Sequence, residues 1–199
     1  MMFRLSCLQM LIEACWASER LTEPTRLTLY VDGSCDGNQN VDASTSAGWG
    51  VVVVQGDSGL GRGSGEIITE LSGPVKTSPD DEEFIGAEVG SNNTAELSGL
   101  FAALRWLLTE EEIDPVRIRL DSQYAGNIAT GAWRAKANRE LAARVQSVWN
   151  EVASRRTLSW DHVRAHRGHR WNERADHLAK RAMKRERPLP LSFWKPGVD

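Results

Sequence analysis

The chain has few of the features that mark secreted, zinc-binding or membrane-spanning proteins. Its 3 cysteines form no C-x-x-C pair and leave an odd number, which argues against a disulfide framework or a cysteine zinc site. The apolar stretch from Phe3 to Trp16 is interrupted by Gln9 and Glu13 and is too short to span a bilayer. We therefore expect a protein of a reducing intracellular compartment, cytoplasm or nucleus, without a membrane.

The chain has fewer basic than acidic residues, 24 against 27, but the basic residues are concentrated in one part of it. The formal net charge of −3 by itself argues against a nucleic-acid partner. Residues 1–116 hold 6 Lys and Arg against 19 Asp and Glu, whereas residues 117–187 hold 17 against 7. Such segregation allows the basic part to neutralise phosphates while the acidic part repels them. The alternative is a pair of solvated helices of opposite charge.

The length of 199 residues suits one domain with a single apolar core. We divide the chain into an N-terminal extension at 1–25, a domain at 26–187 and a C-terminal tail at 188–199. The extension has the pattern of an appended helix, or of the end of a longer segment. Within the domain, residues 73–91 contain two prolines and the acidic cluster Asp80–Glu83, so we expect a disordered loop insertion there.

The rest of the domain has alternating strand-like and helix-like patterns. Three strand-like runs come first, and helices then alternate with two further strands. This order predicts an α/β fold with a five-stranded mixed sheet, antiparallel in its first three strands and parallel afterwards, flanked by helices on both faces. The expected strands are 27–31, 49–54, 60–71, 116–120 and 158–163, and the expected helices are 93–108, 122–130, one from Asn138 past Val152, and one from about Asn172 that ends by Pro188.

Four acidic residues are the candidates for chemistry: Asp32, Glu96, Asp121 and Asp176. Two of them end strand-like runs and two lie in the first turns of helix-like runs, so their carboxylates can converge on one pocket. Mg²⁺ prefers such oxygen ligands and binds through a few carboxylates, water and substrate phosphate. The sequence therefore suggests metal-assisted phosphoryl chemistry.

Each of the four carboxylates also has a purely structural interpretation. Asp32 precedes Gly33 in a turn-like pair and can bond the next backbone amides. Glu96 has capping-box spacing from Asn93, and Asp121 can cap the following helix. Asp176 can complement a helix dipole. One shared site is the more economical explanation of all four.

Five ordered sequence blocks resemble those of the type 1 ribonuclease H family. They are Tyr30-Val-Asp-Gly-Ser-Cys-Asp-Gly-Asn38, Ala47-Gly-Trp-Gly-Val51, Ser91-Asn-Asn-Thr-Ala-Glu96, Asp121-Ser-Gln-Tyr124 and His166-Arg-Gly-His-Arg-Trp-Asn-Glu-Arg-Ala-Asp176. The resemblance covers roughly residues 26–186 and implies an RNase H-like fold. It also implies an endoribonuclease that hydrolyses the RNA strand of RNA/DNA hybrids and leaves 3′-hydroxyl and 5′-phosphate ends.

The resemblance assigns roles to the acidic residues and to a histidine. Asp32 would bridge two Mg²⁺ ions, with Mn²⁺ as a substitute. Asp176 would complete the first site, and Glu96 and Asp121 the second. His166 matches a mobile histidine that shuttles a proton and helps the product leave, and His169 is the competing candidate.

Substrate contacts are implied by the same resemblance. Asn38, Asn93 and Gln123 match residues that hydrogen-bond base edges in the minor groove, and Ser91 matches a residue that lines a pocket for a DNA-strand phosphate. Amides both donate and accept, so they tolerate any base. The implied partner is an RNA/DNA hybrid, and the chain would act as a monomer or as part of a larger polymerase.

The sequence departs from the family pattern at residues 131–137, which are too few for the basic protrusion that helps bacterial members grip the hybrid. Trp133, Arg134 and Lys136 are a candidate remnant of it. A domain of a retroelement polymerase also lacks this protrusion and is one alternative. A non-catalytic hybrid-binding module and an integrase-type strand transferase are the others, and the four acidic residues and the His-x-Gly-His motif disfavour them.

Overall fold

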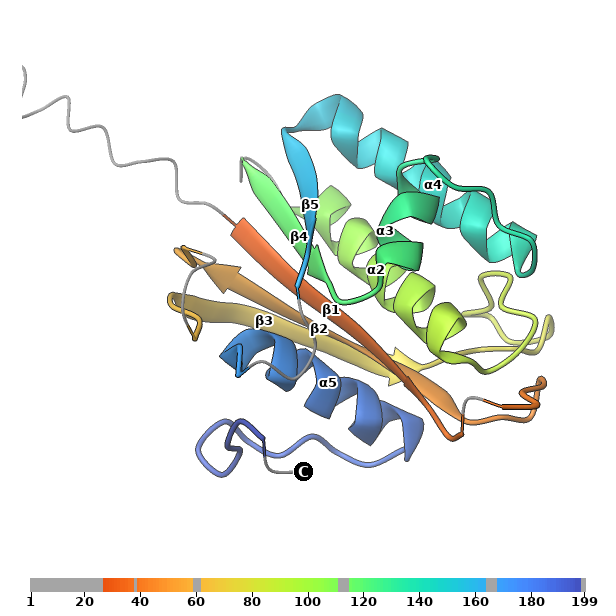
Figure 1. The fold of residues 1–199 in the computed structure, drawn as a ribbon, viewed down its shortest axis with the longest axis horizontal. Helices are drawn as coiled ribbons and strands as arrows, with labels where there is room; N and C mark the ends of the chain where they lie inside the picture. Colours follow the sequence, from red (N-terminus) through yellow and green to blue (C-terminus); the bar gives the residue numbers. More distant parts are fainter. Residues whose placement is uncertain (1–26, 38, 59–61, 111–114, 164–167, 198–199) are drawn as a thin grey trace, which may run out of the picture.

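The computed structural model describes residues 27–37, 39–58, 62–110, 115–163 and 168–197 (Figure 1). The N-terminal extension therefore lies outside the described residues. Among the described helices, none is long and apolar enough to cross a membrane.

The centre of the fold is a five-stranded mixed sheet with the order β3-β2-β1-β4-β5. Strands β1, β2 and β3 pair antiparallel, whereas β4 pairs parallel with β1 and β5 pairs parallel with β4. This arrangement confirms the predicted sheet. The strands are β1 Leu27–Cys35, β2 Ala47–Gln55, β3 Glu66–Pro74, β4 Val116–Leu120 and β5 Leu158–His162.

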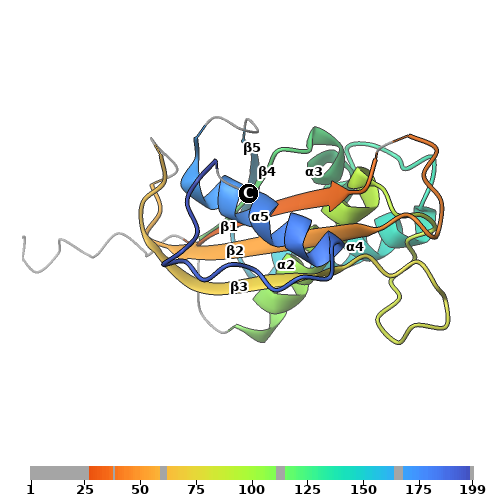
Figure 2. The same cartoon turned by 90° about the horizontal axis from the view of Figure 1, so that it is seen from below.

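Helices cover both faces of the sheet, as predicted. On one face, α2 (Asn92–Thr109), α3 (Gln123–Ala129) and α4 (Arg139–Arg155) share a large apolar core with β1, β2 and β4. On the other face, α5 (Arg170–Met183) packs alone against Tyr30, Val52 and Val54. Figures 1 and 2 show α5 separated from the other helices by the sheet.

The largest differences from the predicted strand boundaries are at the end of β1 and the start of β3. Strand β1 does not end at Asp32 but continues to Cys35, since Asp32 pairs with Gly50 and Gly33 with Trp49. Strand β3 begins at Glu66 and not near residue 60. Gly63 and Gly65 adopt positive φ angles there, which suit a turn and not a strand.

The segment 73–91 was predicted to be a disordered loop, and this prediction is wrong: Gly73 and Pro74 belong to β3, and the rest is packed against the core. Ala87 is fully buried, and Val75 and Ile85 pack against the large core. Lys76 pairs with Asp81 at 2.8 Å and neutralises part of the acidic cluster. The apolar residues within this polar segment give it enough buried surface to adopt one conformation.

The helix caps also differ from the predicted ones. Helix α2 is capped by Ser91, whose hydroxyl accepts a hydrogen bond from the Thr94 amide at 3.2 Å, and the reciprocal bond completes a capping box. Glu96 therefore does not serve Asn93 as the acid of that box. Asn138 precedes α4, but its side chain accepts from the Glu88 amide at 2.8 Å instead of capping the helix.

Helix α5 begins at Arg170, slightly before the predicted start near Asn172, and ends at Met183, before Pro188 as predicted. The predicted C-terminal tail folds back onto this helix. The Leu189 amide donates to His177 at 3.0 Å, and Trp194 is 6 % exposed. Arg174, which is fully buried, bonds Glu70 of β3 and the Leu189 carbonyl, so the segment is fastened to both α5 and β3.

Candidate active site

Three of the predicted acidic residues meet at one end of the sheet. Asp32 and Asp121 each follow the last residue pair between the parallel strands β1 and β4, Val31 with Leu120. Glu96 comes from the second turn of α2. One carboxylate oxygen from each of Asp32, Glu96 and Asp121 lies within 4.8 Å of the other two. Three of the four carboxylates that were predicted to converge therefore lie together in the structure.

A glycine after Asp32 allows Glu96 to reach this group. A Cβ atom at Gly33 would lie 2.5 Å from the Glu96 backbone nitrogen and 2.8 Å from the Ala95 Cβ. Only a residue without a side chain lets α2 approach β1 so closely. The Asp-Gly pair thus serves helix packing within a strand and not a turn. Part of the structural interpretation of Asp32 is nevertheless correct, since its Oδ1 accepts a hydrogen bond from the Gly33 amide at 2.7 Å.

A second glycine brings α5 to the other face of the same strands. A Cβ atom at Gly50, which pairs with Asp32, would lie 2.3 Å from the Ala175 carbonyl oxygen. The close approach places Asp176 near enough to Asp32 that its charge raises the pKa of Asp32. The Asp176 carboxylate itself pairs with Lys180 at 2.9 Å and does not join the three-oxygen group.

Asp121 is held in place through its backbone. His162, at the end of β5, has its Nε2 3.0 Å from the Asp121 carbonyl oxygen. Helix α3 is capped by the Ser122 hydroxyl, which accepts from the Ala125 amide at 3.2 Å. The Asp121 carboxylate is therefore not the helix cap that the structural interpretation expected.

Burial and mutual repulsion make the carboxylates unusually hard to ionise. Asp32 is 6 % exposed and Glu96 is 7 % exposed. Burial raises the pKa of Asp32 well above its usual range, and the charges of Asp121 and Asp176 raise it further. Burial likewise raises the pKa of Glu96, as do the nearby charges of Asp121 and Asp32.

Such a group of carboxylates fits a hard divalent cation. Within the described part of the chain, the buried Oε2 of Glu96 accepts no hydrogen bond. A buried anionic oxygen without a donor is costly, and a cation would offset both this cost and the repulsion between the acids. Asp32, Glu96 and Asp121 are the residues that could hold such an ion, with Asp176 at the rim.

The predicted substrate residues have different placements. Asn93 and Gln123 are exposed in the first turns of α2 and α3. Ser91 is largely buried, and its hydroxyl is engaged in the cap of α2. Asn38 and His166 lie outside the described residues, so their roles remain predictions.

His169, the rival of His166, is buried next to β1. Its side chain is 7 % exposed, and its Nε2 lies 3.1 Å from the Tyr30 hydroxyl. In this position His169 is engaged with Tyr30 of β1 and is largely buried.

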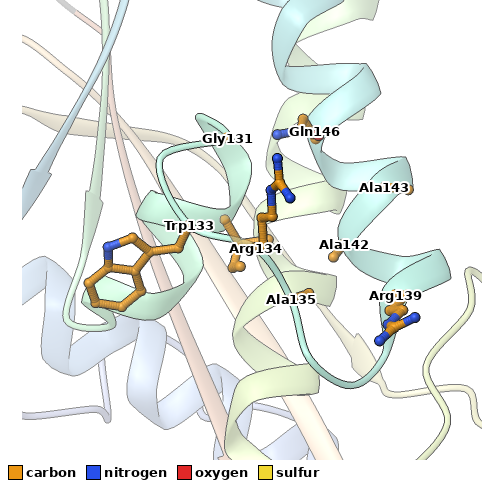
Figure 3. A pocket seen from close by; sticks show the side chains of 9 residues that line it. Gly131, Trp133, Arg134, Ala135, Arg139, Ala142, Ala143 and Gln146 are labelled. Carbon is orange, nitrogen blue, oxygen red and sulfur yellow. The ribbon is translucent and has the colours of Figure 1, made fainter.

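A hollow lined by aromatic, amide and basic side chains lies beside the first turns of α2 and α3. Its volume is about 600 Å³, and it is lined by Asn93, Tyr124, Trp133, Arg134 and Lys136 among others. Asn93 is three residues from Glu96, and Tyr124 is three residues from Asp121. A smaller hollow of about 260 Å³ shares Trp133 and Arg134 with this one and is also lined by Ala142 and Gln146 of α4. Figure 3 shows Arg134 extending toward Gln146 of α4 while Trp133 projects away from it.

Lys180 was not predicted to be part of the site. Its spacing of four residues from Asp176 was the available signal, because side chains at i and i+4 are neighbours on a helix. The close approaches at Gly33 and Gly50 have no comparable local signal, because both depend on helices far away in the sequence.

Comparison with known proteins agrees with this geometry. The sequence profile of the RNase H family matches residues 24–184. A ribonuclease H of Chlorobium phaeovibrioides is 30% identical over 127 residues, 63% of this chain and 67% of that protein. Among solved structures, RNase H1 of Halobacterium salinarum has a TM-score of 0.56 at 27% identity and covers 80% of this chain and 98% of its own. LC11-RNase H1, solved in complex with an RNA/DNA hybrid, has a TM-score of 0.55 at 23% identity over 80% of this chain and 97% of its own. The chain therefore belongs to the RNase H family, whose enzymes hydrolyse the RNA strand of RNA/DNA hybrids.

Proposed function

We propose that this chain cleaves the RNA strand of a hybrid by two-metal-ion catalysis at Asp32, Glu96, Asp121 and Asp176, and leaves 3′-hydroxyl and 5′-phosphate ends. The convergence of three carboxylate oxygens within 4.8 Å carries the proposal. Two bound Mg²⁺ ions would supply a nucleophilic water near neutral pH and stabilise charge on the leaving 3′ oxygen. Mn²⁺, with the same preference for oxygen ligands, would substitute.

The residues of the chain would bind the metal ions, position Asp176 and transfer a proton. Asp32, Glu96 and Asp121 supply concentrated negative charge in a buried setting. Lys180 holds the Asp176 carboxylate at the rim, with its oxygen turned toward the Lys180 ammonium at 2.9 Å. His166 would accept or return a proton as the product leaves, which suits a group whose ordinary pKa is near 6.5.

The surface beside the acids supports a nucleic-acid substrate. Trp133 is 50 % exposed, and a base or sugar can stack on its ring. Arg134 and Lys136 form no ion pair with any carboxylate of the described residues, so their charge is available to phosphates. Asn93 and Gln123 would read base edges, and Ser91 would line a phosphate pocket at the start of α2. Selectivity for hybrid over duplex DNA would come from helix shape and the 2′-hydroxyl.

The experiment compares three end-labelled duplexes of one sequence: RNA/DNA hybrid, RNA/RNA and DNA/DNA. We expect cleavage only of the RNA strand of the hybrid, only with Mg²⁺ or Mn²⁺, and with products that a phosphatase can dephosphorylate at the 5′ end. Binding of hybrid without cleavage would favour a non-catalytic module. Cleavage in the presence of chelator would refute the metal mechanism.

A further inference from the structure

A buried polar network lies beneath the acidic group, on the α5 face of the sheet. At its centre is the hydroxyl of Tyr30, a residue with no exposed surface. This hydroxyl donates a hydrogen bond to Asp57, lies 3.1 Å from His169 Nε2, and accepts one from Arg119 Nη1 at 3.2 Å. With His169 in its Nε2–H tautomer, the one donor and two acceptor positions of the hydroxyl are all used.

The network joins four separate parts of the chain. Tyr30 belongs to β1 and Arg119 to β4, while Asp57 follows β2 and His169 immediately precedes α5. Asp57 also accepts from the amide and the hydroxyl of Ser64, at 3.1 and 3.2 Å, on the other side of the β2–β3 hairpin.

The same hairpin is bonded to the start of α5. The Trp171 indole donates to the Ser64 carbonyl at 2.7 Å, and the Arg170 amide donates to the Arg62 carbonyl at 2.8 Å. The first turn of α5 is thus held both by these hydrogen bonds to the hairpin and by the hydrogen-bond network around Tyr30.

The position of the network relative to the acidic residues is set by the strand geometry. Tyr30 and Arg119 are direct partners in the parallel pair of β1 and β4. Side chains two residues apart on a strand share a face, about 6.6 Å apart along it. Asp32 and Asp121 each follow two residues later, so Tyr30 and Arg119 form the layer immediately below this pair. Asp176 lies seven residues after His169, about two turns along α5.

We propose that Tyr30 is a positioning residue, whose hydroxyl holds the start of α5 against β1 and β4 and thereby sets the distance of Asp176 from Asp32 and Asp121. This inference rests on the proposed function of that site. The hydroxyl is the only part of Tyr30 that all three partners share, and the ring alone already fills the apolar contact with α5. Loss of the hydroxyl therefore removes the hydrogen bonds between these elements, while the ring keeps its packing and its contacts with His169 and Arg119.

The chain offers a matched control on the same strand. Thr28 is fully buried two residues before Tyr30, and its hydroxyl has no hydrogen-bond partner among the described residues. Thr28→Val removes a buried hydroxyl without a role in the network. Tyr30→Phe removes one with three partners.

The test measures kcat and KM on RNA/DNA hybrid, the melting temperature, and Mg²⁺ affinity by NMR titration of the protein without substrate. For Tyr30→Phe we expect kcat to fall about 10-fold and the Mg²⁺ affinity to weaken about 10-fold, with KM within about twofold, since loss of an outer partner of a metal site typically costs 10–100-fold. Thr28→Val should match the wild type in all three. A Tyr30→Phe protein with a lower melting temperature but kcat and Mg²⁺ affinity within about twofold of wild type would overturn the inference.

Asp57→Asn gives a second test if Tyr30→Phe does not fold. It keeps an oxygen acceptor for the Tyr30 hydroxyl and removes the charge. We therefore expect smaller losses of the same kind, about threefold in kcat and in Mg²⁺ affinity. Unchanged values would count against the proposal. Failure of the proposed function is distinguishable, because it would appear as a wild-type protein that leaves the hybrid intact. The Mg²⁺ titration of the variants would still report on positioning.

Discussion

Asp32→Asn is expected to stabilise the metal-free protein even as it abolishes cleavage. The substitution keeps the size of the side chain and the oxygen that accepts the Gly33 amide at 2.7 Å. It removes one of the charges crowded within 4.8 Å. Burial and the neighbouring acids raise the pKa of Asp32, so the folded protein pays for ionising this group at neutral pH.

The magnitude follows from the geometry. Two unit charges 4.8 Å apart repel by roughly 3.5 kcal/mol at an effective dielectric constant of about 20. We expect about 2 kcal/mol to appear as added stability, because Asp121 and Glu96 can share a proton and so already avoid part of the repulsion. For a protein of this size this gain corresponds to about 4–8 °C in melting temperature.

The pH dependence has a definite sign. A carboxyl whose pKa is raised on folding binds a proton more tightly in the folded state, so stability falls as pH rises from its ordinary pKa, about 4, through the raised pKa of the folded protein. Asp32→Asn removes this loss. The advantage of the variant should therefore be absent near pH 3, grow as pH rises and be complete once pH exceeds the raised pKa of Asp32.

The assay is thermal unfolding of wild type and Asp32→Asn across pH, in chelator and in Mg²⁺. Mg²⁺ at about ten times its Kd stabilises a protein that binds it by about 1.4 kcal/mol. In Mg²⁺ the wild type should therefore gain stability, and the difference in stability between the variant and the wild type should narrow. Asp36→Asn, an exposed acid of the same segment, serves as control and should change little. A variant less stable than wild type in chelator at neutral pH would refute this account of the electrostatics.

Three further predictions concern the proton shuttle, the substrate surface and the acidic segment. His166→Ala should lower turnover by at most about 10²–10⁴-fold, since water partly replaces a proton shuttle, and complete loss in a cleavage assay would contradict that role. Arg134→Ala should reduce the salt dependence of hybrid binding by about 0.7–0.9 log units per log salt, and an unchanged slope in a binding titration would remove Arg134 from the phosphate contacts. Replacing Asp80 with Asn and Glu82 with Gln should strengthen hybrid binding at low salt and have little effect at high salt, because salt screens the repulsion between these acids and the phosphates. Equal hybrid binding by variant and wild type at low salt would place this segment away from the substrate.

The sheet and the acidic cluster were predictable because both depend on local patterns. Apolar alternation marks β4 and β5 closely, and helical spacing marks α2. Asp32 and Asp121 come together because the parallel pairing of β1 and β4 ends just before both of them, and Glu96 joins them from the second turn of α2.

The parts that were not predictable depend on contacts between distant residues. Gly33 has the local pattern of a turn, yet it continues β1 because α2 needs the space. The 75–91 segment has a composition typical of disordered loops, yet Ala87 and Ile85 pack against a core formed by other elements. The Tyr30 network unites residues up to 139 positions apart, so no window of sequence contains it.

The most direct test of the account is the single-turnover rate of RNA-strand cleavage by Glu96→Gln, measured on saturating hybrid with Mg²⁺ beside wild type and Asp36→Asn. Glu96 is buried, contributes an oxygen to the acidic group, and has an Oε2 that accepts no hydrogen bond from the described residues. If it is a metal ligand, the rate should fall at least about 10³-fold, close to 4 kcal/mol of barrier, while Asp36→Asn cleaves like wild type. A Glu96→Gln enzyme that keeps more than about a tenth of the wild-type rate, a loss below about 1.4 kcal/mol, would contradict the claim that these carboxylates hold the catalytic metal.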